Sequence, residues 1–342
     1  MTQRSDQPRS RTADLAAAAS GPDRGGPRHR RGRALRGALL AGLLCVTAVG
    51  AASCSSDDAG GAATTTTAAR GQGADPKAGA EPRSGTYLSL GDSYSVGAGA
   101  TDPAKGYADL LPGLLAEHGW DLELVNLGCG GATVGSLAEG DGCQPAMRAH
   151  DAEGYDTSQL DAAVAYLEDH PGEVALITVS IGGNDVTKCA RGADDPIACV
   201  TDAVSTIDAG LEEILTRLRD AAGPDTTIVG LTYPDVILGA WLNEGTRPLA
   251  ELSVVAFEQF INPMYEKRYE AVDGIFVDIT EGTGGYTPLT ETTELEGHGE
   301  VPVAVAEVCE LTWFCDVADI HPKDAGYERI AALVVQALTG TA

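Results

Sequence analysis

The pattern of apolar and polar positions changes repeatedly between two periods after residue 85. Short apolar runs that are typical of strands occur at 86–90, 122–127, 174–181, 226–231 and 274–279. Between them lie segments with apolar residues three or four positions apart, which is typical of helices, at 106–118, 158–170, 200–222, 249–272 and 323–338. We expect a kink or break near Pro263, because proline lacks the N–H that a helix interior requires.

This alternation predicts one α/β domain with a mostly parallel sheet and helices on both faces. The run at 174–181 (VALITVSI) is typical of a central strand that is buried on both sides. In such sheets the functional site lies at the carboxyl ends of the strands. The residues that follow each predicted strand are therefore the candidates for chemistry.

Two of these strand ends carry groups suited to nucleophilic catalysis. Gly91-Asp92-Ser93 follows the first run, and Gly91 can form the tight turn that lifts Ser93 out of the sheet. A glycine-rich stretch at 126–133 follows the second run and lets backbone amides approach a substrate closely. Each motif alone is more often a simple turn.

Two further motifs complete the set. Gly182-Gly183-Asn184-Asp185 follows the third run, and an asparagine amide at a fixed position can donate to a developing oxyanion. His321 precedes the last helix and can act as general base and acid for a serine. Each motif alone is weak evidence, but all four occur in order at strand ends and in the final loop, and this combination indicates a catalytic site.

These four blocks, in this order, resemble those of the SGNH hydrolases, the GDSL esterase/lipase superfamily, over residues 85–342. The resemblance implies a three-layer α/β/α sandwich with a five-stranded, flavodoxin-like parallel sheet and no metal or organic cofactor. It further implies that Ser93 is the nucleophile and His321 the base. The implied oxyanion donors are the Ser93 N–H, the Gly131 N–H and the Asn184 side chain.

The acid that orients the histidine is left open by the sequence. The family usually has an acid three residues before the histidine, and that position is Ala318 here. The candidates are Asp319, the backbone carbonyl of Ala318 and Asp316, in decreasing order of preference. A carboxylate or a carbonyl in this role fixes the imidazole tautomer and orientation.

The N-terminal part predicts export. Residues 1–53 hold nine of the 23 basic residues and end in an apolar run at 38–49, which is too short for a membrane span and fits a signal peptide. The sequence before Cys54 resembles a bacterial lipobox, so we expect a lipid on Cys54. Cleavage after 50–52, which would release a free secreted protein, is the alternative. Residues 54–84, rich in Ala, Gly, Thr and Ser, predict a flexible linker, and 85–342 the catalytic domain.

Cysteine spacing also favours an exported protein. Besides Cys45 and Cys54, six cysteines remain, and their spacing suggests three local disulfides among 15 possible connectivities. A metal site is less favoured, since no C-x-x-C or H-x-x-x-H spacing is present. The expected pairs are Cys129–Cys143, Cys189–Cys199 and Cys309–Cys315.

The net charge of the chain limits the classes of partner that it can bind. The net charge of -27 argues against binding to nucleic-acid phosphates or docking to anionic lipid. We expect a monomeric serine ester hydrolase, of carboxylesterase or lipase type, that acts on a small ester or acylated substrate. An O-deacetylase of cell-wall or other polysaccharides is the alternative, and a non-catalytic binding lipoprotein is less favoured. The inserted segments 236–246 and 280–315 are expected to shape the pocket.

Overall fold

The computed structural model describes residues 81–191 and 196–341. The expected signal peptide at 1–53, most of the expected linker at 54–84 and the lipidation candidate Cys54 lie outside the described residues. The first described strand, β1, begins at Ser84, close to the expected start of the catalytic domain. Within the described ranges, no helix has both the length and the apolar character needed to span a membrane.

A five-stranded parallel sheet forms the centre of the domain, with strand order β2-β1-β3-β4-β5. This is the flavodoxin-like order that the resemblance implied. The central strand β3 is buried at every position, as its apolar run predicted. The strands are β1 (Ser84–Gly91), β2 (Asp121–Asn126), β3 (Val174–Ser180), β4 (Thr227–Leu231) and β5 (Ile275–Val277).

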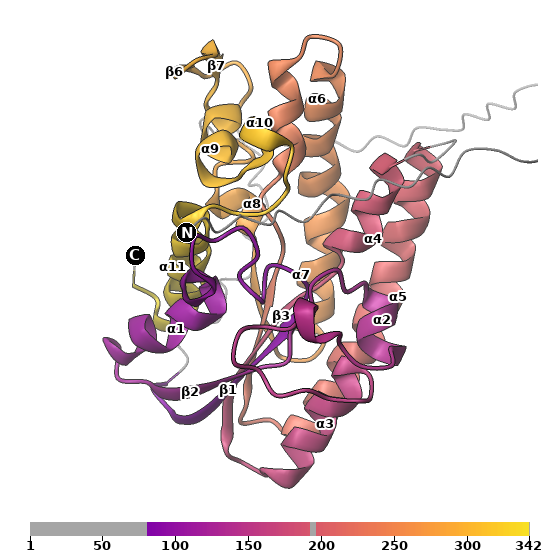
Figure 1. The fold of residues 1–342 in the computed structure, drawn as a ribbon, viewed down its shortest axis with the longest axis vertical. Coiled ribbons are helices and arrows are strands. Elements are labelled where there is room, and N and C mark those ends of the chain that lie inside the picture. Colours follow the sequence, from indigo (N-terminus) through magenta and orange to yellow (C-terminus); the bar gives the residue numbers. More distant parts are fainter. Residues whose placement is uncertain (1–80, 192–195, 342) are drawn as a thin grey trace, which may run out of the picture. The chain divides into compact units, whose positions relative to one another are not determined.

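Helices cover both faces of the sheet, so the architecture is the expected three-layer sandwich. One face packs against α2 (Val134–Glu139), α3 (Gln159–Asp169), α5 (Pro196–Ala222) and α7 (Asn262–Glu270). The other face packs against α1 (Tyr107–Ala116) and α11 (Asp324–Thr339). Figure 1 shows α1 and α11 on one side of the strands and α2, α3 and α5 on the other.

The expected helix at 249–272 is divided, as the proline predicted. It consists of α6 (Arg247–Ala256), a π-helical turn (Phe257–Ile261) and α7. Because Pro263 has no N–H, the carbonyl one turn before it has no regular partner, and the wider turn accommodates this loss.

The sequence did not predict several short elements, because each is too short to show a clear period of apolar residues. They include α4 (Gly183–Thr187), α8 (Ile279–Gly282) and a hairpin of β6 (Thr292–Leu295) and β7 (Gly299–Pro302). Two more, α9 (Val303–Leu311) and α10 (Phe314–Val317), lead into the histidine loop. The hairpin and α9 bury a small third core with parts of the 236–246 segment and α6. In Figure 1 this region lies beyond the ends of the strands.

All three expected disulfides are present: Cys129–Cys143, Cys189–Cys199 and Cys309–Cys315. They close loops of 14, 10 and 6 residues in sequence separation. Structural disulfides of this kind persist in oxidising compartments, so they indicate an exported protein.

Candidate active site

The nucleophile candidate lies on a tight turn directly after β1. Gly91 has φ +145°, and a Cβ there would lie 2.2 Å from the Ser180 carbonyl oxygen, so only glycine fits. Gln159 holds this turn from the start of α3: the Gly91 N–H donates to Gln159 Oε1 (2.6 Å) and Gln159 Nε2 donates to the Gly91 carbonyl (3.1 Å). Ser93 is thereby fixed at the edge of the sheet with 8% of its surface exposed.

The glycine-rich loop after β2 leaves one backbone amide free. From Gly128 to Val134, every N–H other than that of Gly131 donates to a protein acceptor. In the part of the chain that the structure describes, the Gly131 N–H has no acceptor. Gly131 has φ +82°, a left-handed conformation that turns the amide out of the loop's own hydrogen-bond pattern. This is the arrangement that an oxyanion donor requires.

The third block ties the glycine-rich loop at 126–133 to the turn that carries Ser93. Asn184 Nδ2 donates to the Ala132 carbonyl (2.9 Å) and lies 3.4 Å from Asp92 Oδ2. Asp185, which is 2% exposed, accepts from the Val134 N–H (2.9 Å). Burial raises the pKa of Asp185. The long contact to Asp92 leaves one Asn184 N–H only weakly held, and an oxyanion can take it.

Asp92 is the most strongly perturbed carboxyl group of the site. It is 1% exposed, and burial raises its pKa to about 7 against the opposing effect of its hydrogen bonds. Asp92 accepts from the Tyr94 N–H (3.0 Å) and from Tyr233 Oη (2.7 Å). Tyr233 follows the carboxyl end of β4, so a fourth strand contributes to the site.

The histidine loop brings one of the three acid candidates to the imidazole. Asp319 Oδ1 lies 2.5 Å from His321 Nδ1 and also accepts from the His321 backbone N–H (3.2 Å). Asp316 instead pairs with Lys323 (2.8 Å). Ala318 has φ +56°, a left-handed turn that ends α10 just before Asp319.

Three hydrogen bonds join the nucleophile segment to the histidine segment. Tyr94 Oη donates to the Ile320 carbonyl (2.7 Å), Trp313 Nε1 to the Gly99 carbonyl (2.8 Å) and Tyr327 Oη to the Ala98 carbonyl (2.6 Å). Gly99 also makes room for the histidine, because a Cβ there would lie 2.7 Å from His321 Cβ. The two segments are therefore held together although more than 200 residues separate them.

An apolar cavity of about 80 Å³ lies beside these residues. Tyr94, Gly183 and Ile320 line it, and each is a sequence neighbour of Ser93, Asn184 or His321. Val236 and Ile237 contribute from one of the two segments expected to shape the pocket. The other segment, 280–315, contributes no lining residue, because its side chains fill the third core instead.

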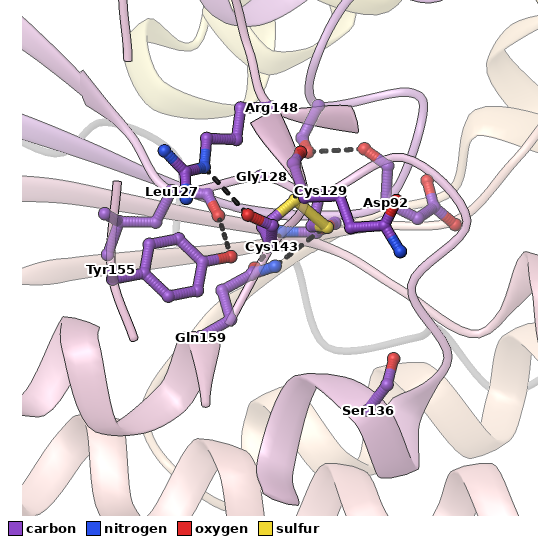
Figure 2. The surroundings of a disulfide bond; sticks show 12 residues. Asp92, Leu127, Gly128, Cys129, Ser136, Cys143, Arg148, Tyr155 and Gln159 are labelled. Atoms are coloured by element: carbon purple, nitrogen blue, oxygen red, sulfur yellow. Dashed lines mark hydrogen bonds between the residues drawn. A yellow bond between two sulfur atoms is a disulfide. The ribbon is translucent and has the colours of Figure 1, made fainter. Parts of the chain in front are cut away.

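The Cys129–Cys143 disulfide, drawn in Figure 2, fastens the segment at 143–148 to the glycine-rich loop at 126–133. Around it, Arg148 Nε donates to the Cys143 carbonyl (2.9 Å) and Tyr155 Oη donates to the Leu127 carbonyl (2.9 Å). The Gly130 N–H donates to the Met147 carbonyl (2.7 Å). These contacts fix the loop that carries the free Gly131 N–H.

Comparison with protein families places this site in a known context. Residues 89–329 match the model of the GDSL-like lipase/acylhydrolase family. The chain belongs to this family. Membership makes it a hydrolase of carboxylic ester bonds, and the match includes all four sequence blocks. The comparison with curated protein sequences gives no match.

Solved structures similar to this esterase have low sequence identity. TesA is 19% identical, with a TM-score of 0.40, and the match covers 75% of this chain and 98% of that one. The psychrotrophic esterase EstA from Pseudoalteromonas sp. is 14% identical, with a TM-score of 0.39 and coverage of 74% and 96%. A two-domain esterase (CEX) active on acetylated mannans is 11% identical, with a TM-score of 0.39. The match to CEX covers 75% of this chain and 49% of CEX.

The structure of this esterase places Ser93, Gly131 and Asn184 in the segments that follow β1, β2 and β3. It places Asp319 and His321 in the loop between α10 and α11. It pairs His321 with Asp319 and directs Asp316 to Lys323. Sequence reasoning missed Gln159 and Tyr233, which support this site from α3 and β4. Tyr233 stands two residues after the predicted strand at 226–231, so the strand-end rule could have found it, whereas no sequence signal marked Gln159.

Proposed function

We propose that this esterase hydrolyses its substrate by two-step acyl transfer through Ser93. The observation that carries the proposal is the free Gly131 N–H in a loop whose neighbouring amides are all paired. Such a donor stabilises a negative oxygen without reorganisation when the tetrahedral intermediate forms. Together with the Asn184 amide and the Ser93 N–H, it makes a three-donor oxyanion hole.

The proton steps follow from the Asp319–His321 pair. His321 takes the proton of Ser93 Oγ as the oxygen attacks the ester carbonyl, and then gives the proton to the leaving alcohol. Asp319 holds Nδ1, so that Nε2 is the nitrogen that exchanges the proton. Water then attacks the acyl-enzyme with His321 again as base, which releases the acid and restores Ser93.

We further propose a short to medium acyl group as the preferred substrate. The cavity of about 80 Å³ has room for roughly five to eight water-sized groups, since each requires about 10–15 Å³ of such volume. Its walls include Ile237, Phe257 and Ile261, which suit an alkyl chain and not a sugar. Polysaccharide O-deacetylation remains the competing activity, since an acetyl group also fits.

The test is a series of p-nitrophenyl esters from acetyl to palmitoyl, together with acetylated glycans. We expect the highest kcat/KM between butanoyl and octanoyl. Ile237→Trp should fill the cavity and move the optimum to acetyl, whereas Leu252→Trp, at an exposed position on α6 outside the cavity lining, should leave it unchanged. A preference for acetylated glycan over every aryl ester would overturn the acyl-chain proposal.

For the cellular context we propose export and anchoring through a lipid on Cys54, with the folded domain acting as a monomer on small esters. The disulfides support export, and the basic, apolar and lipobox-like segments before Cys54 support the anchor. Labelling of the parent and of Cys54→Ala with an alkynyl fatty acid tests the anchor. Incorporation into both proteins, or into neither, would contradict it.

A further inference from the structure

Met147 lies against the glycine pair that contains the free oxyanion donor. It ends a 3₁₀ turn (Pro145–Met147), and its carbonyl accepts from the Gly130 N–H (2.7 Å). A methyl group built on Gly131 would have Met147 Cε as its single neighbour within 4 Å, at 3.7 Å, and one built on Gly130 would lie 3.2 Å from the same atom. The end of the thioether side chain therefore packs over this part of the loop.

The position of Met147 is fixed and not incidental. Two links hold the 143–148 segment to the glycine-rich loop, one on each side of Met147. They are the Cys129–Cys143 disulfide and an antiparallel backbone β-bridge between Cys129 and Arg148. The backbone of Met147 is thus held beside the glycine pair, and the side chain starts from a fixed point next to Gly131.

Met147 is also accessible to solutes. It is 42% exposed, which is unusual for a large apolar side chain in this domain. The sequence contains three methionines, of which Met1 lies outside the described residues and Met264 is partly buried against the main core. Of the two methionines that the structure describes, Met147 is therefore the more accessible to a small oxidant in solution.

We propose that Met147 is an oxidation site through which hydroperoxides inactivate this esterase; the inference rests on the proposed acyl-transfer function. The Met147 sulfur attacks one oxygen of hydrogen peroxide, the O–O bond breaks, and a sulfoxide and one water form. The sulfur loses two electrons and the peroxide gains them. The product is a polar, chiral side chain in place of a flexible apolar one.

The sulfoxide affects catalysis through the neighbouring amide. The sulfoxide oxygen is a strong hydrogen-bond acceptor and is bonded to the sulfur of the side chain that packs over Gly131. The Gly131 N–H is the one amide of this loop that has no hydrogen-bond partner among the described residues. A hydrogen bond between them withdraws a donor from the oxyanion hole. Loss of one such donor lowers kcat by roughly 10²–10³-fold in other acyl-transfer enzymes. We therefore expect at least about a tenfold loss of kcat on full oxidation, because two donors remain.

The experiment treats the parent enzyme, Met147→Leu and Met264→Leu with hydrogen peroxide over a range of doses. Peptide mass spectrometry measures the sulfoxide at each methionine, and butanoyl ester hydrolysis measures kcat and KM on the same samples. Each variant is compared with its own untreated sample. We expect kcat of the parent and of Met264→Leu to fall in proportion to Met147 sulfoxide, with KM changed less than kcat, and Met147→Leu to resist the same doses.

Two results would overturn the proposal. One is Met147→Leu losing activity in step with the parent, which would place the damage elsewhere. The other is complete oxidation of Met147 with kcat unchanged within twofold. A failure of the acyl-transfer function itself would be recognised separately, as Ser93→Ala retaining the activity of the untreated parent.

Discussion

The pairing of His321 with Asp319 can be tested by replacing Asp319 with asparagine. Asparagine keeps the size of the side chain but removes its charge, so the bond between Oδ1 and His321 Nδ1 loses its charge assistance. It also permits the wrong imidazole tautomer, since its amide can donate to Nδ1. Both effects reduce the fraction of enzyme in which Nε2 can take the Ser93 proton.

The magnitude follows from the geometry and the exposure of the pair. A hydrogen bond to a charged group contributes about 1.5–3 kcal/mol. The Asp319 side chain is 43% exposed and that of His321 24%, so solvent screening places the expectation near the lower end. At about 1.5–2 kcal/mol, kcat falls roughly ten- to thirtyfold, because 1.36 kcal/mol corresponds to a factor of ten.

Steady-state hydrolysis of a butanoyl ester measures this loss, with KM expected to stay within about twofold because Asp319 acts on proton transfer and not on binding. Asp316→Asn is the matched control, since Asp316 pairs with Lys323 and not with the imidazole. If kcat of Asp319→Asn falls less than threefold, Asp319 does not orient the histidine. An equal loss in Asp316→Asn would show that any charge change in this loop acts through its fold.

Three further changes test the supporting structure. Gly131→Ala keeps the backbone N–H but disfavours the left-handed φ of +82° that aims it, so the variant should lose about 1–2 kcal/mol of stability and about tenfold in kcat. Gly172→Ala, at φ +79° with nothing within 4 Å, should lose the same stability in urea titration but no activity. Equal kcat for both variants would contradict a role for the left-handed conformation of Gly131 in catalysis. Tyr233→Phe should lower kcat about five- to tenfold at constant KM and destabilise the protein more at pH 8 than at pH 5, because the lost bond favours ionised Asp92; equal destabilisation at both pH values would contradict this. Asp235 is 1% exposed and burial raises its pKa to about 7, so the folded state holds its proton more tightly and stability falls between pH 4 and pH 7, by at most about 4 kcal/mol. In Asp235→Asn, the free energy of unfolding measured by denaturation should fall less between pH 4 and pH 7. An unchanged dependence on pH would contradict the raised pKa of Asp235.

The sheet could be predicted because its signals are local. Apolar runs such as 174–181 stand between helical segments, and a parallel sheet with crossover helices is the arrangement that buries them. The break before Pro263 was predictable for the same reason, since it depends on one missing N–H. The hairpin could not be predicted, because its short strands of mixed polarity show no clear alternation. The helix α9 could not be predicted either, because a run of nine mostly apolar residues does not distinguish a buried helix from a buried strand.

The site divides along similar lines. The candidate residues at strand ends could be placed at one edge of the sheet, because a parallel sheet collects its carboxyl ends there. The partner of His321 was not decided, because Asp316, Ala318 and Asp319 lie in one loop and the sequence does not show which way each points. The left-handed turn at Ala318 settles the geometry by bringing Asp319 to the imidazole. Gln159 was missed because its contacts depend on how α3 packs against β1, which no local pattern records.

The central claim is that Ser93 forms the acyl-enzyme. Reaction of the exported domain with a fluorophosphonate, followed by peptide mass spectrometry and residual hydrolysis of the butanoyl ester, tests it most directly. The account predicts one label per molecule on the Ser93 peptide, activity lost in proportion to labelling, and no label in Ser93→Ala. Labelling of Ser93→Ala, or ester hydrolysis by that variant near the parent rate, would contradict it.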